Sequence, residues 1–457
     1  MSSEYKTIDD QVGLIGGTVL LMGTVIGIMT FVLPGELIGE AGPSITLALV
    51  LTAIPMVFAV LLLLQLGGAI PVAGGIYVYA SRLVGPYWGF LAIWLMVPAI
   101  WSVLLFTAYG FADFTLFLLP FDVPHSLLMA LVLVTFLTLN LLGITLVTQV
   151  QLVMVAGLIT GMVAFILTGL PNVDPANFTP LLEDGADPGG FEGFLIALVA
   201  LYIPFQGFTM IIELGEELEN PIKNIPRVLG LGMLFSVLLT LGLVVVFTGL
   251  APWDQLVHEE AGVAAAAGDF IHPGIGTAVA VAAILGAFTS LNALITSYSR
   301  TIMRAARDET VPGHLAAIHP RLNVPHRAIV LLGLPPILFA PFSPGPVTLS
   351  IFLALILLFA NMVSGVALWR LPKRFPLRYE HSFYRLPLPL LKVTAVSVAF
   401  FSSFFWLAML TELPEIVVVI VALILLGYVV YRIRVHRYAE RGIDLKEKMG
   451  ALHEHEQ

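Results

Sequence analysis

Long apolar runs separated by short polar segments dominate the chain from residue 13 to residue 432. About 20 apolar residues suffice to cross a bilayer, and inside lipid only a helix satisfies the polar groups of its own backbone. The pattern therefore predicts an all-α polytopic membrane protein with about twelve transmembrane helices. The approximate ranges are 13–33, 44–66, 88–119, 126–142, 146–170, 191–214, 226–250, 274–299, 327–342, 346–369, 387–410 and 413–432.

The composition supports this interpretation and excludes several classes of protein. Only 11% of the 457 residues are charged, whereas a soluble domain has about 25%. A soluble enzyme, a disordered chain and a nucleic-acid binder are therefore excluded, and the lipid bilayer is the expected surrounding. The chain has no cysteine, so it has no disulfide or thiol chemistry. The first twelve residues are polar and precede a full-length span, so no cleavable signal peptide is expected.

The charges are divided between the two sides of the predicted bundle. All 21 Lys and Arg residues fall on one side, and the other side has fourteen acidic residues with no Lys or Arg. Because cytoplasmic loops carry the excess of Lys and Arg, this pattern predicts a multi-pass protein of the cell membrane with both termini in the cytoplasm. The acidic side reflects either hydration and the avoidance of basic loops, or a high-salt habitat or the attraction of external cations. The sequence leaves both interpretations open.

Glycine and proline interrupt two spans near their middles. Broken helices at matching positions in two halves of a chain are typical of a transporter with a midplane site. There, freed backbone groups can bind a substrate or an ion. The alternative is a pair of kinks that only shape helix packing. The two segments are Gly23-Thr24-Val25-Ile26-Gly27, followed by Pro34-Gly35, and Pro204-Phe205-Gln206-Gly207-Phe208.

Four motifs in order resemble the amino acid–polyamine–organocation superfamily of secondary transporters, over roughly residues 10–370. The first is the segment from Gly23 to Gly27 with Phe31, Pro34-Gly35 and Gly42-Pro43. The second is Pro71-Val72-Ala73-Gly74-Gly75-Ile76-Tyr77-Val78-Tyr79, then Gly85-Pro86 and Gly89-Phe90. The third is Glu216-Glu217-Leu218-Glu219-Asn220-Pro221 with Ile225-Pro226-Arg227. The fourth is Ser299-Arg300, Ala306-Arg307-Asp308, Pro312 and Pro325.

The resemblance implies a five-plus-five inverted repeat with two further helices. On this division, residues 1–12 form a cytoplasmic segment, 13–170 the first repeat and 191–370 the second. Residues 387–432 then form helices 11 and 12, and residues 433–457 a cytoplasmic tail. The substrate would bind at the two breaks and the facing part of the third span. The implied residues are Thr24, Val25, Ile26, Gly27, Phe205, Gln206, Gly207, Phe208, Thr209, Trp101 and Ser102.

The chain departs from the family pattern at several of these positions. In relatives, a Gly-x-Gly segment of helix 1 binds a substrate carboxylate through backbone amides, and here Met29 adds bulk in the segment Gly27-Ile28-Met29. Gln65 replaces the usual glutamate at the inner end of the second span. Thr209 stands where an acidic residue is common, which disfavours a cationic substrate.

The fifth and eighth spans bear on ion coupling. Some sodium-independent relatives place a lysine in the fifth span, where this chain has Gly157 and no basic residue. In the eighth span, adjacent Thr289 and Ser290 resemble the sodium ligands of the sodium-coupled neurotransmitter transporters. The predicted sodium site combines their hydroxyls with backbone carbonyls, a set of neutral oxygens that suits a hard cation. Ordinary hydroxyl contacts to the preceding turn remain the alternative. The ligands are Gly23, Ile26, Gly286, Thr289 and Ser290.

Charged residues near the span ends are candidates for gating. Arg300 and Arg304 lie on one face of the extended eighth span, and an ionic contact with Glu217 would close the inner gate. A solvated acidic turn and a basic helix end are the alternative. Asp113 lies in the outer half of the third span and is a candidate proton carrier or outer gate. It could equally be an acid at the membrane interface.

Together these features predict a secondary active transporter that imports an amino acid or a related small amine-containing solute by alternating access. Sodium symport is the first coupling mode, with proton symport and exchange as alternatives. Apart from the sodium ion, no cofactor and no obligate protein partner are expected. A non-transporting membrane sensor is the alternative from another class. A membrane-embedded enzyme is disfavoured, because all ten histidines are expected in loops or tails.

Overall fold

The computed structural model describes residues 13–70, 75–143, 145–181, 190–205, 207–208, 220–257, 261–382 and 384–440, together with 442, 444, 445 and 449. Within these residues the chain is helical and has no strand. The helices are α1 (Leu14–Val25), α2 (Met29–Ala41), α3 (Ser44–Ala69), α4 (Gly75–Tyr79), α5 (Pro86–Leu118), α6 (His125–Leu142), α7 (Thr145–Gly169), α8 (Phe191–Ala200), α9 (Pro221–Gly249), α10 (Trp253–Leu256), α11 (Gly262–Phe270), α12 (Pro273–Arg307), α13 (His326–Phe339), α14 (Pro346–Arg374), α15 (Pro376–Glu380), α16 (Leu388–Glu412) and α17 (Pro414–Ala439).

Each of the twelve predicted spans contains at least one helix, which confirms the all-α polytopic fold. Among the described residues, nine helices are long and apolar enough to cross a membrane. Three shorter apolar helices, Leu14–Gly23, Phe191–Ala200 and His326–Phe342, account for the remaining spans. Several helices run past the predicted span, as α12 does to Arg307. The apolar pattern marks only the lipid-buried part of a helix, and the charged residues beyond it continue the same helix.

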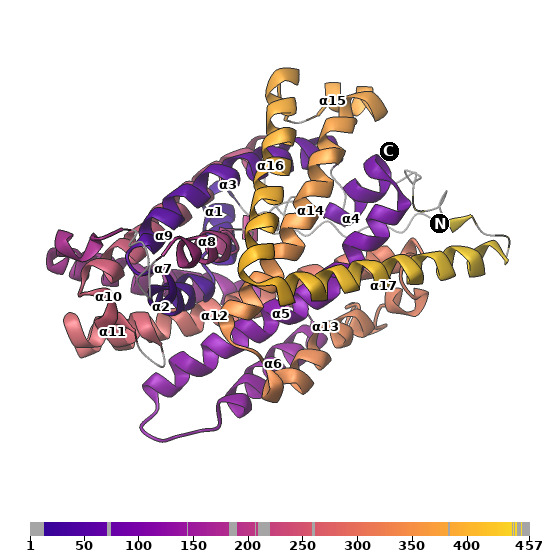
Figure 1. Cartoon of the computed structure of the whole chain (residues 1–457). Helices are drawn as coiled ribbons and strands as arrows, with labels where there is room; N and C mark the ends of the chain where they lie inside the picture. The colour runs from indigo at the N-terminus through magenta and orange to yellow at the C-terminus, as the bar shows by residue number, and fades with distance from the viewer. Residues whose placement is uncertain are drawn as a thin grey trace.

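The helices pack into two groups. In the first, α1 packs mainly on α9, while α2 and α3 both pack on α8. Helix α7 packs mainly on α12 and also contacts α1 and α9, so it touches both groups. In the second, α5 lies against α12, α14 and α6, and α13 packs on α6 and α5. Figure 1 shows α10 and α11 at one end of the bundle, and α4 between α14 and α17 near the other end. The division of the chain into two inverted repeats stays a prediction.

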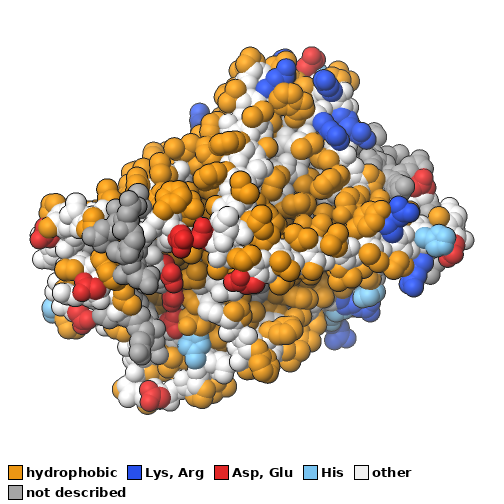
Figure 2. Space-filling model, in the orientation of Figure 1, with side chains coloured by type: hydrophobic (Ala, Val, Ile, Leu, Met, Phe, Trp, Pro, Cys, Tyr) orange, Lys and Arg blue, Asp and Glu red, His pale blue; other side chains and the backbone are white. Residues whose placement is uncertain are grey.

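Charge separates the two ends of this bundle. Figure 2 shows most Lys and Arg side chains along the upper and right-hand margins, while Asp and Glu gather mainly on the opposite side. Apolar side chains cover the surface between them. We call these the basic end and the acidic end. An apolar belt between polar ends is the surface that a bilayer requires.

Small residues bring α7 and α12 close together. A Cβ atom added at Gly157 would lie 2.6 Å from Leu285 Cδ1, and one at Gly161 would lie 3.0 Å from the carbonyl oxygen of Ala278. Such small residues let transmembrane helices approach closely. Gly157 occupies the position at which some relatives have a lysine. In this structure it therefore serves as a packing contact.

A buried ion pair joins separate segments at the basic end. Arg82, in the π-helical turn η1 (Ala80–Val84), is fully buried, and its Nη2 lies 2.9 Å from Asp308 Oδ2 at the end of α12. The Tyr77 hydroxyl donates to the same carboxylate at 2.8 Å, and burial raises the pKa of that hydroxyl. Arg82 Nη1 also donates to the backbone carbonyl of Met449 in the C-terminal tail. This pair therefore ties together three parts of the chain that are distant in sequence.

Replacing Arg82 by methionine should destabilise the protein strongly. The substitution removes the closer arginine partner of the buried Asp308 carboxylate and leaves only the longer contact with Arg304. Removing one member of a buried ion pair costs about 3–5 kcal/mol. Thermal unfolding of the purified protein in detergent would measure the effect. Arg307→Met is the matched control, because Arg307 lies next to Asp308 at the end of α12 but is exposed. Equal melting temperatures for the two variants would contradict this assignment.

Candidate functional site

The first span is broken at its middle, as the sequence predicts. Helix α1 ends at Val25 and α2 begins at Met29. The amide of Ile26 still donates to the carbonyl of Met22, and the amide of Phe31 donates to that of Ile28. The last carbonyls of a helix and the first amides of the next have no partner within their own helix. The break therefore places backbone acceptors of α1 beside backbone donors of α2.

The sixth span is interrupted as well, slightly earlier than the sequence indicates. Helix α8 ends at Ala200, four residues before Pro204, and the chain continues as a tight turn through Tyr202 and Ile203. The amide of Leu201 donates to the Ala197 carbonyl, and that of Ile203 donates to Ala200. A proline cannot continue a helix without losing a hydrogen bond, which accounts for an end upstream of Pro204. Gln206, Thr209 and the acidic motif with Glu217 lie outside the described residues, as does the side chain of Thr24.

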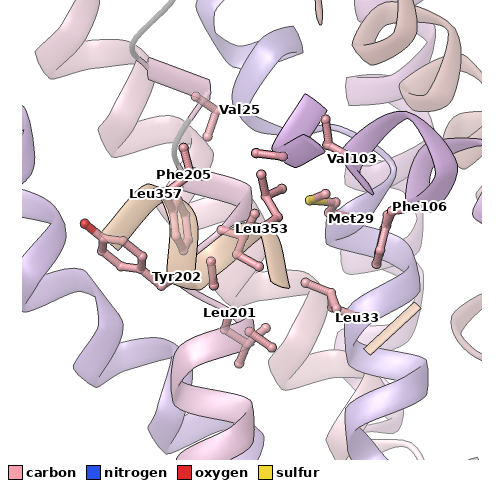
Figure 3. Close-up of a cluster of buried hydrophobic side chains, with 14 of the residues drawn as sticks. Val25, Met29, Leu33, Val103, Phe106, Leu201, Tyr202, Phe205, Leu353 and Leu357 are labelled. Carbon is pink, nitrogen blue, oxygen red and sulfur yellow. The ribbon is translucent and has the colours of Figure 1, made fainter. Parts of the chain in front are cut away.

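A cavity lies between the two breaks. Its volume is about 90 Å³. Figure 3 shows apolar side chains from both breaks gathered here, with Val25 and Met29 near Val103 and Leu353. The cavity is lined by Val25, Gly27, Met29, Ile76, Ile100, Val103, Thr107, Ile203, Pro204, Gly207, Ser290, Ala293, Leu294, Tyr298, Leu353 and Leu357.

The described lining carries hydroxyl groups but no charged side chain. Its polar side chains are Thr107, Ser290 and Tyr298. The Thr107 hydroxyl donates to the carbonyl of Val103 in its own helix at 2.7 Å. Among the described residues, the charge beside the cavity is therefore mainly that of the helix ends. The C-terminus of α1 carries partial negative charge and the N-terminus of α2 partial positive charge.

Three of the predicted sodium ligands lie together beside this cavity. Thr289 is buried, and its Oγ1 lies 3.4 Å from the Gly23 carbonyl oxygen and 3.0 Å from that of Gly286. The contact to Gly286 is the ordinary hydroxyl bond to the preceding turn. Ser290 instead faces the cavity beside Gly27, where an added Cβ would lie 2.4 Å from its Oγ. The donor set is neutral and oxygen-rich, which fits a hard monovalent cation.

The contribution of α5 differs from the residues that the sequence indicates. Trp101 Nε1 donates to the Leu331 carbonyl at 3.1 Å, and Ser102 Oγ donates to the Leu349 carbonyl at 2.8 Å. Both side chains thus join α5 to neighbouring helices and are not part of the cavity lining. Ile100 and Val103 line it instead. Residues three or four apart share a helix face, so the cavity-facing side of α5 lies next to the predicted one.

Asp113 lies in a small pocket near the acidic end. It is 5% exposed, and its Oδ1 lies 2.8 Å from Nε2 of His125. His125, expected in a loop, is the first residue of α6. Glu36 of α2 lines the same pocket as Asp113. Asp113 is therefore a buried, paired group in this structure, and its role as proton carrier or gate stays a prediction.

The predicted inner gate is only partly described. Arg304 Nε lies 3.7 Å from Oδ1 of Asp308, a carboxylate at the end of its own helix. Arg300, one turn earlier on α12, is partly exposed. Because Glu217 lies outside the described residues, its contact with Arg304 stays a prediction.

Paired broken helices around a cavity near the middle of the bundle define a secondary transporter of the broken-helix type. Comparison with known proteins agrees. The family model described as amino acid permease matches residues 12–430. The chain therefore belongs to the amino acid permease family, within the superfamily that its motifs resemble, and it is a transporter and not an enzyme.

Characterised and uncharacterised relatives match over most of their length. The Branched-chain amino acid permease BcaP of Bacillus subtilis is 28% identical, over 73% of this chain and 74% of its own. The Serine/threonine exchanger SteT of the same organism is 26% identical, over 88% and 92%. An uncharacterized transporter of Mycobacterium tuberculosis is 31% identical, over 71% and 72%.

Replacing Gly27 by alanine should destabilise the break. The new Cβ would lie 2.4 Å from Ser290 Oγ, and overpacking of this kind costs about 1–3 kcal/mol. The melting temperature of the purified protein should fall, and Gly27→Ala combined with Ser290→Ala should recover most of it. Gly230→Ala is the control, because no atom lies within 4 Å of a Cβ added there. If the melting temperature of Gly27→Ala equals that of the control, the close contact between the break and α12 does not exist.

Proposed function

We propose that the protein is a secondary active transporter that imports a neutral amino acid with an aliphatic side chain. The observation that carries this proposal is the cavity between the two helix breaks, whose described lining is apolar and uncharged. An arginine, lysine or glutamate side chain would lose its hydration there without gaining a partner of opposite charge. The name of the relative BcaP points to the same class of substrate.

The backbone at the first break supplies the recognition of the amino acid group. Helix N-termini bind anions through amides that have no partner within the helix, so α2 receives the substrate carboxylate near Met29. The ammonium group then lies toward the carbonyls at the end of α1, around Val25. Opposite helix ends separated by Ile26, Gly27 and Ile28 match the two opposite charges of a zwitterion.

Aliphatic side chains from several helices enclose the remainder of the substrate. Val25 and Met29 come from the broken span, Val103 from α5, and Leu353 and Leu357 from α14. Each buried methylene adds about 0.8 kcal/mol. Leucine has three more side-chain carbons than alanine, so it should be preferred by a factor on the order of 10 to 100.

The two packing groups of helices provide the moving parts for alternating access. One group contains both breaks, in α1–α2 and after α8, and the other contains α5 and α12, which line the opposite wall. Rocking of one group against the other would expose the cavity at each end in turn. With the basic end in the cytoplasm, import moves the substrate from the acidic end to the basic end.

Sodium symport is the coupling mode that we propose. The oxygens of Gly23, Gly286 and Thr289 that lie together in the structure would hold the ion. Gly23 lies in the broken first span, and Gly286 and Thr289 lie in α12, so the site connects the two packing groups. A bound cation would therefore stabilise one arrangement of the two groups. It would also add positive charge beside the end of α1.

Liposomes containing the purified protein should take up leucine, isoleucine and valine well and alanine poorly. Arginine and glutamate in excess should not compete, because the described lining has no charged side chain to pair with theirs. Competition against labelled leucine measures the order. Strong inhibition by arginine or glutamate, with none by isoleucine, would refute the proposed substrate class.

Leucine uptake should depend on an inward sodium gradient. Thr289→Val removes the hydroxyl and keeps the shape, so it should raise the sodium concentration for half-maximal uptake by about tenfold, the loss expected for a bond of about 1.4 kcal/mol. Thr160→Val is the control, since the Thr160 hydroxyl donates only to its own helix on an exposed face. If wild-type uptake is independent of sodium but depends on a proton gradient, the protein is a proton symporter. If uptake requires amino acid inside the vesicle, the protein is an exchanger.

A further inference from the structure

Helix α14 presents one face to both the cavity and the second break. Leu353 and Leu357 line the cavity, and Asn361 lies one turn beyond Leu357 on the same face. The Asn361 side chain is buried, with 7% exposed, and its Nδ2 donates to the Tyr202 hydroxyl oxygen at 3.0 Å. A single helix face thus touches the substrate space at two positions and holds a neighbouring segment at the third.

Tyr202 belongs to the broken sixth span. It is the second residue after α8 ends, it directly precedes the cavity-lining Ile203, and it is 2% exposed. Its ring packs edge-on against Phe405 of α16, with ring centres 5.8 Å apart. Figure 3 shows its hydroxyl directed away from Met29 and the cavity. Neither Tyr202 nor Asn361 lines the cavity, and both lie behind its wall.

The bond between them fixes the distance between two parts of that wall. One part is Ile203 and Pro204 at the break, and the other is Leu353 and Leu357 on α14. Both polar groups are buried within the lipid-embedded part of the bundle, where a lost partner leaves a donor unsatisfied. Interhelical hydrogen bonds of this kind contribute about 0.6 kcal/mol on average and up to about 1.7 kcal/mol.

We propose that Asn361 and Tyr202 form a positioning pair that sets the width of the substrate cavity and thereby selects the length of the side chain. The inference rests on the proposed transport of aliphatic amino acids and names residues that determine its specificity. The hydrogen bond holds the second break against α14, so that a leucine side chain contacts both walls. Without the bond the break moves from α14, and a long side chain loses contacts that a short one never makes.

The expected signature is a change in KM that depends on substrate size. In Tyr202→Phe the ring keeps its packing on Phe405 and only the hydroxyl is removed. The KM for leucine should rise about 3- to 15-fold, which corresponds to the energy of one interhelical bond. The KM for alanine and the maximal rate should each change by less than about twofold. A purely structural role would lower the amount of folded protein without altering the ratio of the two KM values.

A double-mutant cycle tests the pairing directly. Tyr202→Phe, Asn361→Leu and the double variant are reconstituted, and the KM for leucine and for alanine is measured for each. Ser364→Ala is the matched control on α14, since the Ser364 hydroxyl donates only to the Ala360 carbonyl of its own helix. The double variant should be no worse than either single variant. If Asn361→Leu does not yield folded protein, the comparison of the leucine and alanine KM values between Tyr202→Phe and Ser364→Ala tests the pairing.

The failures of the two proposals are distinguishable. A wild-type protein that takes up no leucine would overturn the substrate class. Wild-type uptake together with an unchanged leucine KM in Tyr202→Phe would overturn the positioning pair alone. Losses that add in the double variant, or that affect alanine and leucine equally, would also overturn it.

Discussion

A backbone amide or carbonyl inside a bilayer has no water to bond, and this constraint governs the arrangement of the chain. Helices meet it along most of the described length. Two spans violate it, where α1 gives way to α2 and where α8 ends at Ala200. Residues of both breaks line the cavity. In the function that we propose, a zwitterionic substrate bonds to the backbone groups that these breaks free.

The cost of burying an unpaired polar group also governs where the charged side chains lie. The cavity carries hydroxyls and no described charge, and the buried ion pair of Arg82 and Asp308 lies at the basic end, away from it. Asp113 and His125 are paired near the acidic end. The described lining of the cavity therefore has no charged side chain. In the function that we propose, the site distinguishes substrates by the helix ends at the first break and by the shape of its apolar walls, which the Tyr202–Asn361 pair holds in position.

The sequence predicts the spans and both breaks, because each depends on local properties: an apolar run fits the bilayer, and glycine or proline weakens a helix. Contacts between distant residues were not predictable in the same way. Arg82 and Asp308 lie 226 positions apart, and nothing in the sequence around either residue indicates that they pair. Trp101 and Ser102 illustrate the same limit, because a fully apolar helix gives no hydrophobic periodicity from which to decide which face turns inward. Tyr202 lies two residues before the predicted break at Pro204, and only its bond to Asn361 reveals its place.

The central claim is that the opposed helix ends at the first break bind both charged groups of an amino acid. Equilibrium binding to the purified protein of leucine, isoamylamine and 4-methylpentanoic acid tests this claim most directly, since the three share a side chain but differ in charge. The account predicts that leucine binds at least tenfold more tightly than either analogue. Equal affinity for leucine and isoamylamine would contradict it, because the N-terminus of α2 would then contribute nothing to recognition.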